Sequence, residues 1–129
     1  MNKSFGKIKI LCVEDDMLLS SLIGKKLGEL GAALFSADNG ESAIEIAQRE
    51  KPDVMLLDIL LPGMDGFEIL KKIKADERTK RIKVIALSNL NRDSDIEKGK
   101  KLGAVRFLTK VSVGLNEIVK EIKAVLAEK

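Results

Sequence analysis

Short apolar runs alternate with longer amphipathic segments five times along this chain of 129 residues. The apolar runs predict strands over residues 8–13, 33–37, 54–58, 83–88 and 105–109. Between them, apolar side chains recur three and four residues apart, which is the spacing of an amphipathic helix. This alternation predicts right-handed crossovers and an α/β fold, with a parallel sheet covered by helices on both faces.

The predicted helices differ in the strength of their apolar stripes. The first begins after the first strand and ends near Gly31, and the fifth fills the last part of the chain. The fourth, over 94–102, has only a thin apolar face. We interpret all the stripes as core, including that of the first helix, which comprises Leu18, Leu19, Leu22, Ile23, Leu27 and Leu30.

The composition narrows the possible locations and folds. The length suits one domain, so we expect a single domain over 1–129 with no effector domain. No apolar run approaches the ~20 residues that span a bilayer, and the first residues lack the apolar region of a signal peptide. We therefore expect a cytoplasmic protein with no membrane partner.

Missing residue types exclude several kinds of chemistry. The chain has no histidine, which removes histidine metal sites and Ser-His-Asp catalysis. It also lacks Trp and Tyr, so we do not expect it to bind nucleic acid by stacking aromatic side chains on the bases. Residues 71–110 hold 13 basic and 5 acidic side chains. We interpret this excess as a solvated lysine-rich surface, and expect no direct nucleic acid binding.

Polar side chains gather where the predicted strands end. Glu14 and Asp15 follow the first strand, Asp58 ends the third, Ser88 ends the fourth and Lys110 follows the fifth. Parallel strands bring such positions to one edge, where ligands bind in open sheets. Crowded carboxylates need a compensating cation, and oxygen ligands favour Mg²⁺. Each signal alone fits a helix cap or a solvated side chain, but together they suit phosphoryl transfer to a carboxylate.

Four segments resemble the receiver domains of two-component response regulators. They are ILCVEDD at 10–16, DILLPGMDG at 58–66, ALS at 86–88 and FLTK at 107–110. The steps of 30 residues from Asp58 to Ser88 and of 52 residues from Asp58 to Lys110 also fit that family. The resemblance implies a flavodoxin-like, doubly wound sheet of five parallel strands in the order 2-1-3-4-5, with five helices.

The resemblance also implies a role for each matching residue. Asp58 would accept a phosphoryl group from a histidine kinase or a phosphotransfer protein. Asp15 and Asp58 would bind Mg²⁺, Glu14 would act mainly through a metal-bound water, and Leu60 would add its backbone carbonyl.

The remaining matches concern the response to phosphorylation. Lys110 and Ser88 would hold the phosphoryl oxygens, and Phe107 would turn inward when Ser88 moves; as an alternative, Phe107 only covers the sheet. An output protein, not identified by sequence, would bind the face formed by helix four, strand five and helix five. We expect a monomer or a phosphorylation-dependent dimer.

Three positions depart from the family pattern. Val111 replaces the usual proline after the lysine, so we expect a trans peptide and a shifted loop. Asn89 stands where a small residue is usual, and we hypothesise that it slows hydrolysis of the phosphoryl group. The segment 101–107 lacks the acidic pair typical of receivers that dimerise through this face.

Two other functions remain open at this point. A haloacid-dehalogenase-type phosphatase also uses an aspartyl nucleophile, but it requires a second acid where this chain has Leu60. A phosphorylation-independent interaction module is the other alternative, and the intact set of polar residues argues against it. We expect a signalling switch and not an enzyme in the usual sense.

Overall fold

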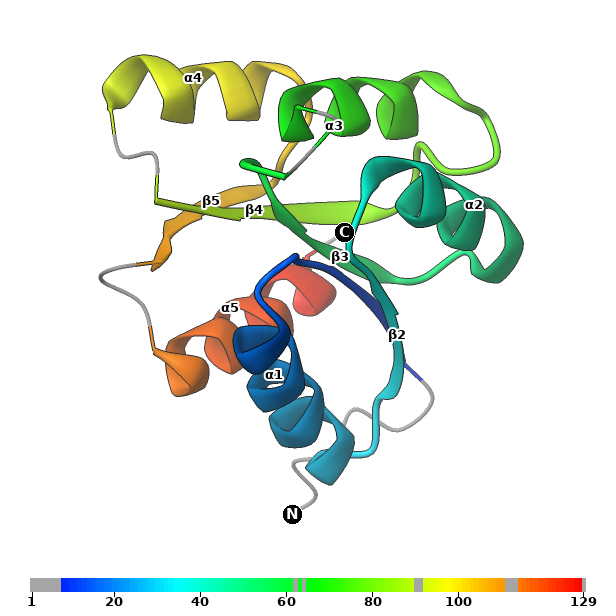
Figure 1. The fold of residues 1–129 in the computed structure, drawn as a ribbon, viewed down its shortest axis with the longest axis vertical. Coiled ribbons are helices and arrows are strands. Elements are labelled where there is room, and N and C mark those ends of the chain that lie inside the picture. Colours follow the sequence, from blue (N-terminus) through cyan, green and yellow to red (C-terminus); the bar gives the residue numbers. More distant parts are fainter. Residues whose placement is uncertain (1–7, 62, 64, 90–91, 111–113, 129) are drawn as a thin grey trace.

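A parallel sheet between two layers of helices forms the centre of the molecule (Figure 1). The computed structural model describes residues 8–61, 63, 65–89, 92–110 and 114–128. The strands follow the order β2-β1-β3-β4-β5, and all neighbours are parallel. Their bounds are β1 Lys9–Val13, β2 Ala33–Ala37, β3 Val54–Asp58, β4 Lys83–Ser88 and β5 Arg106–Thr109.

The helices α1 and α5 cover one face of the sheet, and α2, α3 and α4 cover the other (Figure 1). Their bounds are α1 Met17–Glu29, α2 Gly40–Glu50, α3 Gly66–Ala75, α4 Asp93–Lys101 and α5 Leu115–Ala127. This arrangement is the flavodoxin-like fold that the resemblance implies, so the predicted fold class and strand order are confirmed.

The central strand β3 explains the unbroken apolar run over residues 54–57. All five of its residues are buried. Met55 and Leu57 pack in the core beneath α2 and α3, whereas Val54 and Leu56 pack in the core beneath α1 and α5. Because successive side chains of a strand point to opposite faces, a strand covered on both sides must be apolar at every position. The run ends at Asp58, where the sheet reaches its carboxyl edge.

The prediction that the whole apolar stripe of α1 packs in the core was wrong in part. Ile23 and Leu27 are buried, but Leu18 is 71% exposed and Leu22 is 43% exposed. Leu18 and Leu22, one turn apart, lie on the side of α1 that faces solvent, whereas Ile23 and Leu27 pack against the sheet. The helix therefore buries a narrow row and leaves a second apolar row in solvent.

Helix α4 is held more weakly than the others. Gly99 is its only buried residue, and Arg92 at its N-cap makes no side-chain capping bond. The helix spans Asp93–Lys101, one residue earlier at each end than predicted. Across the described ranges, no helix combines the length and the apolar character needed to cross a membrane.

Candidate functional site

The end of β1 supplies two carboxylates to the carboxyl edge of the sheet. Glu14 is 3% exposed, and its backbone N–H donates to the Ala37 carbonyl (3.0 Å). Its Oε2 accepts the N–H of Asp16 (3.0 Å), which holds the side chain in place. Asp15 follows on the surface. Asp16 has another task, because its Oδ1 accepts the N–H groups of Leu18 and Leu19 and so caps α1.

Asp58 lies buried at the end of β3, with 3% of its surface exposed. Its Oδ1 accepts the N–H of Leu60 (3.0 Å). The chain then turns tightly, with Gly66 N–H donating to the Ile59 carbonyl (2.8 Å). A Cβ at position 66 would lie 2.4 Å from the Ile59 Cα, so only glycine fits there. This close contact fixes the loop that begins at the Asp58 carboxylate.

Lys110 reaches this carboxylate from the end of β5. Its Nζ lies 3.0 Å from Asp58 Oδ2 and 2.8 Å from Glu14 Oε1. The sequence placed Lys110 near the phosphoryl oxygens but did not anticipate its contact with Glu14. Partial burial opposes the charge of Lys110, yet its hydrogen bonds to Glu14 and Asp58 raise its pKa above the usual value.

The site has more negative than positive charge. Burial raises the pKa of the Glu14 carboxyl, and Asp58 contributes to this, although hydrogen bonds from Lys110 and Asp16 oppose it. Glu14, Asp15 and Asp58 can together carry three negative charges, whereas Lys110 supplies one positive charge. Glu14 Oε1 is also buried without an aligned hydrogen-bond donor, despite its short contact with Lys110. A second cation would offset the excess negative charge and would give the buried Glu14 Oε1 a partner.

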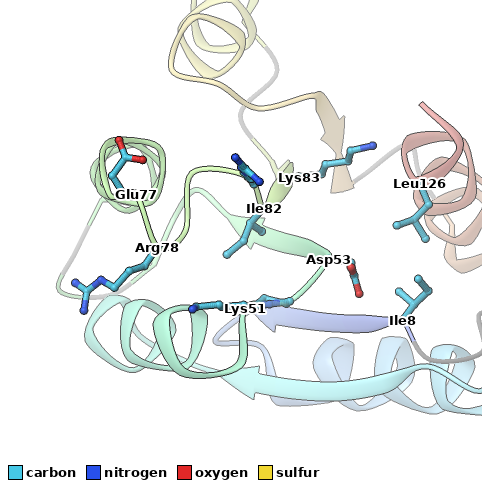
Figure 2. A pocket seen from close by; sticks show the side chains of 10 residues that line it. Ile8, Lys51, Asp53, Glu77, Arg78, Ile82, Lys83 and Leu126 are labelled. Carbon is cyan, nitrogen blue, oxygen red and sulfur yellow. The ribbon is translucent and has the colours of Figure 1, made fainter. Parts of the chain in front are cut away.

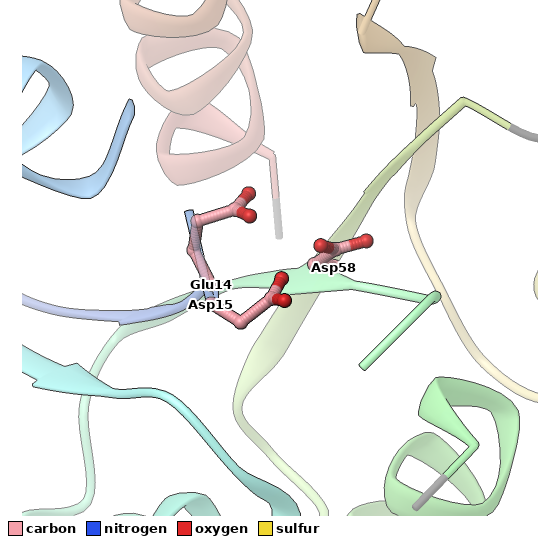
Figure 3. Close-up of side chains that lie close together, drawn as sticks. All are labelled: Glu14, Asp15 and Asp58. Carbon is pink, nitrogen blue, oxygen red and sulfur yellow. The ribbon is translucent and has the colours of Figure 1, made fainter. Parts of the chain in front are cut away.

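Three carboxylates converge where that cation would bind. Glu14, Asp15 and Asp58 each offer an oxygen, and these oxygens all lie within 4.8 Å of one another. Figure 3 shows Glu14 and Asp15 extending from the end of β1 beside Asp58 on β3. Such an oxygen-only set fits a hard divalent cation such as Mg²⁺ or Mn²⁺. The predicted metal residues are thus brought together, and Leu60, predicted as a carbonyl ligand, is 52% exposed beside them.

Ser88 and Phe107 lie on the strands next to this cluster. Ser88 is fully buried at the end of β4, in register with Thr109 of β5. Phe107 is half-buried and packs against the core beneath α3 and α4. Asn89 lines a small cavity together with Lys110 and Leu18. Val111 lies outside the described residues, as does the peptide geometry predicted for it.

A larger cavity lies at the opposite edge of the sheet, where β1, β3 and β4 begin. It has a volume of about 660 Å³, and Asp53, Lys83 and Arg78 are among its lining residues (Figure 2). Their polar groups already have partners within the fold. Asp53 Oδ2 accepts the Lys9 N–H (2.9 Å), Lys83 donates to the Val125 carbonyl (2.8 Å), and Arg78 pairs with Asp76 (2.8 Å). The cavity is therefore no rival to the Asp58 cluster as a reaction centre.

Comparisons with known proteins agree with this geometry. A family model described as the response regulator receiver domain matches residues 10–123. Protein PilH of Pseudomonas aeruginosa is 35% identical over 119 residues, which is 92% of this chain and 98% of PilH.

Solved structures show the same likeness. The signal receiver domain of a DNA binding response regulator from Colwellia psychrerythraea has a TM-score of 0.86 and 31% identity, covering 95% of this chain and all of that one. The Mn²⁺-bound form of response regulator Rcp1 has a TM-score of 0.77 and 29% identity, covering 93% and 92% of the two chains. This chain belongs to the response regulator receiver domain family.

Proposed function

We propose that this chain is a phosphoryl-operated signalling switch in which Asp58 accepts the phosphoryl group. The observation that carries the proposal is the contact of the Lys110 ammonium with the buried Asp58 carboxylate, 3.0 Å away, beside two further carboxylates. These 129 residues contain no histidine, so the phosphohistidine of a donor lies outside them. A histidine kinase or a phosphotransfer protein supplies that group.

The residues of the site suit the transfer. An Asp58 oxygen attacks phosphorus, the new O–P bond forms, and the P–N bond to the donor imidazole breaks. Lys110 moves from the carboxylate to a phosphoryl oxygen and keeps its positive charge, because a lysine is protonated at neutral pH and its new partner is also an anion. Ser88 donates its hydroxyl hydrogen to another phosphoryl oxygen. These two residues neutralise and orient the group, and positioning is the main source of catalysis.

Glu14, Asp15, Asp58 and the Leu60 carbonyl would hold Mg²⁺. The buried Glu14 Oε1 and the surplus of carboxylates support this assignment, as does the Mn²⁺-bound Rcp1 relative. When bound, Mg²⁺ supplies positive charge that offsets the phosphoryl and carboxylate oxygens. Asp16 stays outside this set because it caps α1.

The exposed apolar row on α1, formed by Met17, Leu18 and Leu22, is the docking surface that we propose for the phosphodonor protein. Leu18 and Leu22 line the same small cavity as Lys110, so the row continues directly into the site. A donor must deliver its phosphohistidine to that opening. A donor that covers these three apolar side chains gains affinity for the chain and leaves Asp58 accessible.

The output surface is the face formed by α4, β5 and α5. A ~100-fold change in the ratio of active to inactive forms requires ~2.7 kcal/mol of differential stabilisation, which contacts of Ser88 and Lys110 with the phosphoryl group can supply. On this face Arg106 forms ion pairs with Glu121 and Glu128 of the same chain. Arg106 is therefore already engaged, which favours a monomer that binds a different protein here.

Phosphorylation by acetyl phosphate tests the proposal. Wild type should become labelled only when Mg²⁺ is present, and Asp58→Asn should not. Asp53→Asn is the matched control, because Asp53 precedes the same strand at its other end and should leave labelling unchanged. Persistent labelling of Asp58→Asn refutes the assignment. Turnover of a phosphomonoester would favour the phosphatase, and a partner that binds wild type and Asp58→Ala equally would favour the interaction module.

A further inference from the structure

The two outer strands of the sheet, β5 and β2, differ in how well they are protected from pairing with another chain (Figure 1). β5 carries Arg106, which forms ion pairs with Glu121 and Glu128. β2 has the sequence ALFSA, with no charged residue and no proline. Ala33 and Ser36 are exposed on it, and across the described residues β1 is its only pairing strand. Charges and prolines are common devices that keep a sheet edge unpaired, so β2 is an open edge.

The backbone of β2 faces β1 and the open edge in alternation. Ala33 donates its N–H to the Ile8 carbonyl (2.9 Å), and the Ala37 carbonyl accepts a backbone N–H at the other end of β1 (3.0 Å). Because the direction of these groups reverses at each residue of a strand, the N–H and C=O groups of Leu34 and Ser36 point away from β1. An unpaired row of this kind is a template for another strand.

A groove beside this edge leaves room for such a strand. It has a volume of about 650 Å³, and Ser36 and Ala37 of β2 line it together with residues of α1 and α2. The α1 side includes small residues such as Ser21 and Gly24, and a Cβ at Gly24 would meet no atom within 4 Å. Nothing in the described part of the chain therefore fills the space next to this part of α1.

The charges around the groove suit a second copy of this chain. Its charged lining residues are Glu14, Lys25, Asp38, Glu45 and Arg49. This near balance of signs offers little to a strongly acidic or strongly basic partner. Glu45 and Arg49 are exposed one turn apart on α2, so a two-fold axis beside the helix would bring each glutamate toward the arginine of the other copy. Arg49 is 58% exposed, and its described contact, with Glu50 (3.2 Å), uses only Nε.

We propose that β2 pairs antiparallel with β2 of a second copy, about a two-fold axis at Phe35, so that the two sheets join into one. Leu34 of each chain then exchanges both backbone hydrogen bonds with Ser36 of the other copy. Phe35, which is half-buried, faces Phe35 of the other copy, and the two rings cover each other. The contact uses neither Asp58 nor the face formed by α4, β5 and α5. It therefore forms without phosphorylation and leaves that face of each chain open.

Sedimentation equilibrium of the whole chain, from about 10 µM to about 1 mM, measures this pairing. Wild type should form a dimer whose fraction rises over that range, as expected for a small interface. Ser36→Pro should weaken the dimer by about 10–100-fold, because proline removes an N–H that points to the other copy and none that pairs with β1. Ser36→Ala is the matched control, since alanine keeps the N–H, and its dimer should be as tight as that of wild type.

Charge exchange on α2 supplies a second test that leaves the strand unchanged. Glu45→Arg and Arg49→Glu should each weaken the dimer by about 3–10-fold, because like charges then meet across the two-fold axis. The double variant should regain most of the wild-type affinity, since it restores opposite charges in exchanged positions. If circular dichroism shows that Ser36→Pro does not fold, these exposed positions of α2 decide the question.

The possible results separate the β2 pairing from other contacts. A wild type that stays monomeric up to about 1 mM overturns the proposal and leaves the edge to an extended segment of a different protein. A dimer that Ser36→Pro and the single charge exchanges leave equally tight also overturns it, because another face would then form the contact. Equal weakening by Ser36→Ala and Ser36→Pro overturns it as well, since the backbone N–H would not be the cause. None of these results bears on Asp58, which labelling by acetyl phosphate tests separately.

Discussion

Replacing Lys110 with methionine tests the charge balance of the site. Methionine keeps the length of the side chain but removes the ammonium between Glu14 and Asp58, whose side chains are only 2% and 3% exposed. Removing one partner of a buried ion pair costs about 3–5 kcal/mol. Lys110 itself is 18% exposed, and solvent screening lowers this to about 2–3 kcal/mol of unfolding free energy.

For a chain of 129 residues, that loss corresponds to a decrease in Tm of about 7–11 °C at pH 7 without divalent metal. The loss should be smaller near pH 5, because Glu14, whose pKa is already raised, takes up a proton and removes one of the unpaired charges. Mg²⁺ should raise the Tm of Lys110→Met more than that of wild type, since the metal replaces the missing positive charge.

Differential scanning calorimetry at pH 5 and pH 8, with and without Mg²⁺, measures these differences. Lys72→Met is the control, because this exposed lysine of α3 should change the unfolding free energy by less than about 0.5 kcal/mol. A Tm for Lys110→Met within about 1 °C of wild type, or a loss of equal size at both pH values, would refute the charge balance described above.

Three further predictions concern neighbouring positions. Because its pKa is raised in the folded state, the Glu14 carboxyl favours folding below pH ~4.5 and this contribution is lost as pH rises. In urea unfolding without divalent metal, the free energy of unfolding of Glu14→Gln should therefore fall less toward pH 8 than that of wild type. An unchanged pH profile would contradict this. Gly66→Ala should destabilise the fold by about 1–3 kcal/mol through its collision with the Ile59 backbone, and equal urea midpoints would contradict this. Asn89→Ala should lose the phosphoryl group faster than wild type, and slower loss would sink the hypothesis that Asn89 limits access.

The apolar pattern was enough to predict the strands, the helices and a parallel α/β sheet, whereas the strand order came from the family resemblance. Five strands and five helices lie where the periodicity places them, and the ends of β1, β5 and α4 differ by one residue. β3 was the clearest element, because a strand buried on both faces has no polar position until it ends. The leucines of α1 were harder, since six apolar residues occupy more of the helix than the sheet covers. Sequence cannot tell which row of such a helix will pack.

The sequence also predicted which side chains gather at the candidate site. The carboxylates and Lys110 meet because parallel strands bring their carboxyl ends to one edge. The sequence did not show which of the three adjacent acids belong to the site. In the structure Asp16 caps α1, whereas Glu14 and Asp15 lie close to Asp58.

Chemical identification of the phosphorylated residue is the most direct test of the account. After treatment with acetyl phosphate and Mg²⁺, borohydride reduces an aspartyl phosphate to homoserine, which peptide mass spectrometry locates. We predict homoserine at position 58, none without Mg²⁺ and none in Asp58→Asn. Homoserine at Asp15 or Asp53 instead, or none in wild type, would contradict the role of Asp58 as the phosphoryl acceptor.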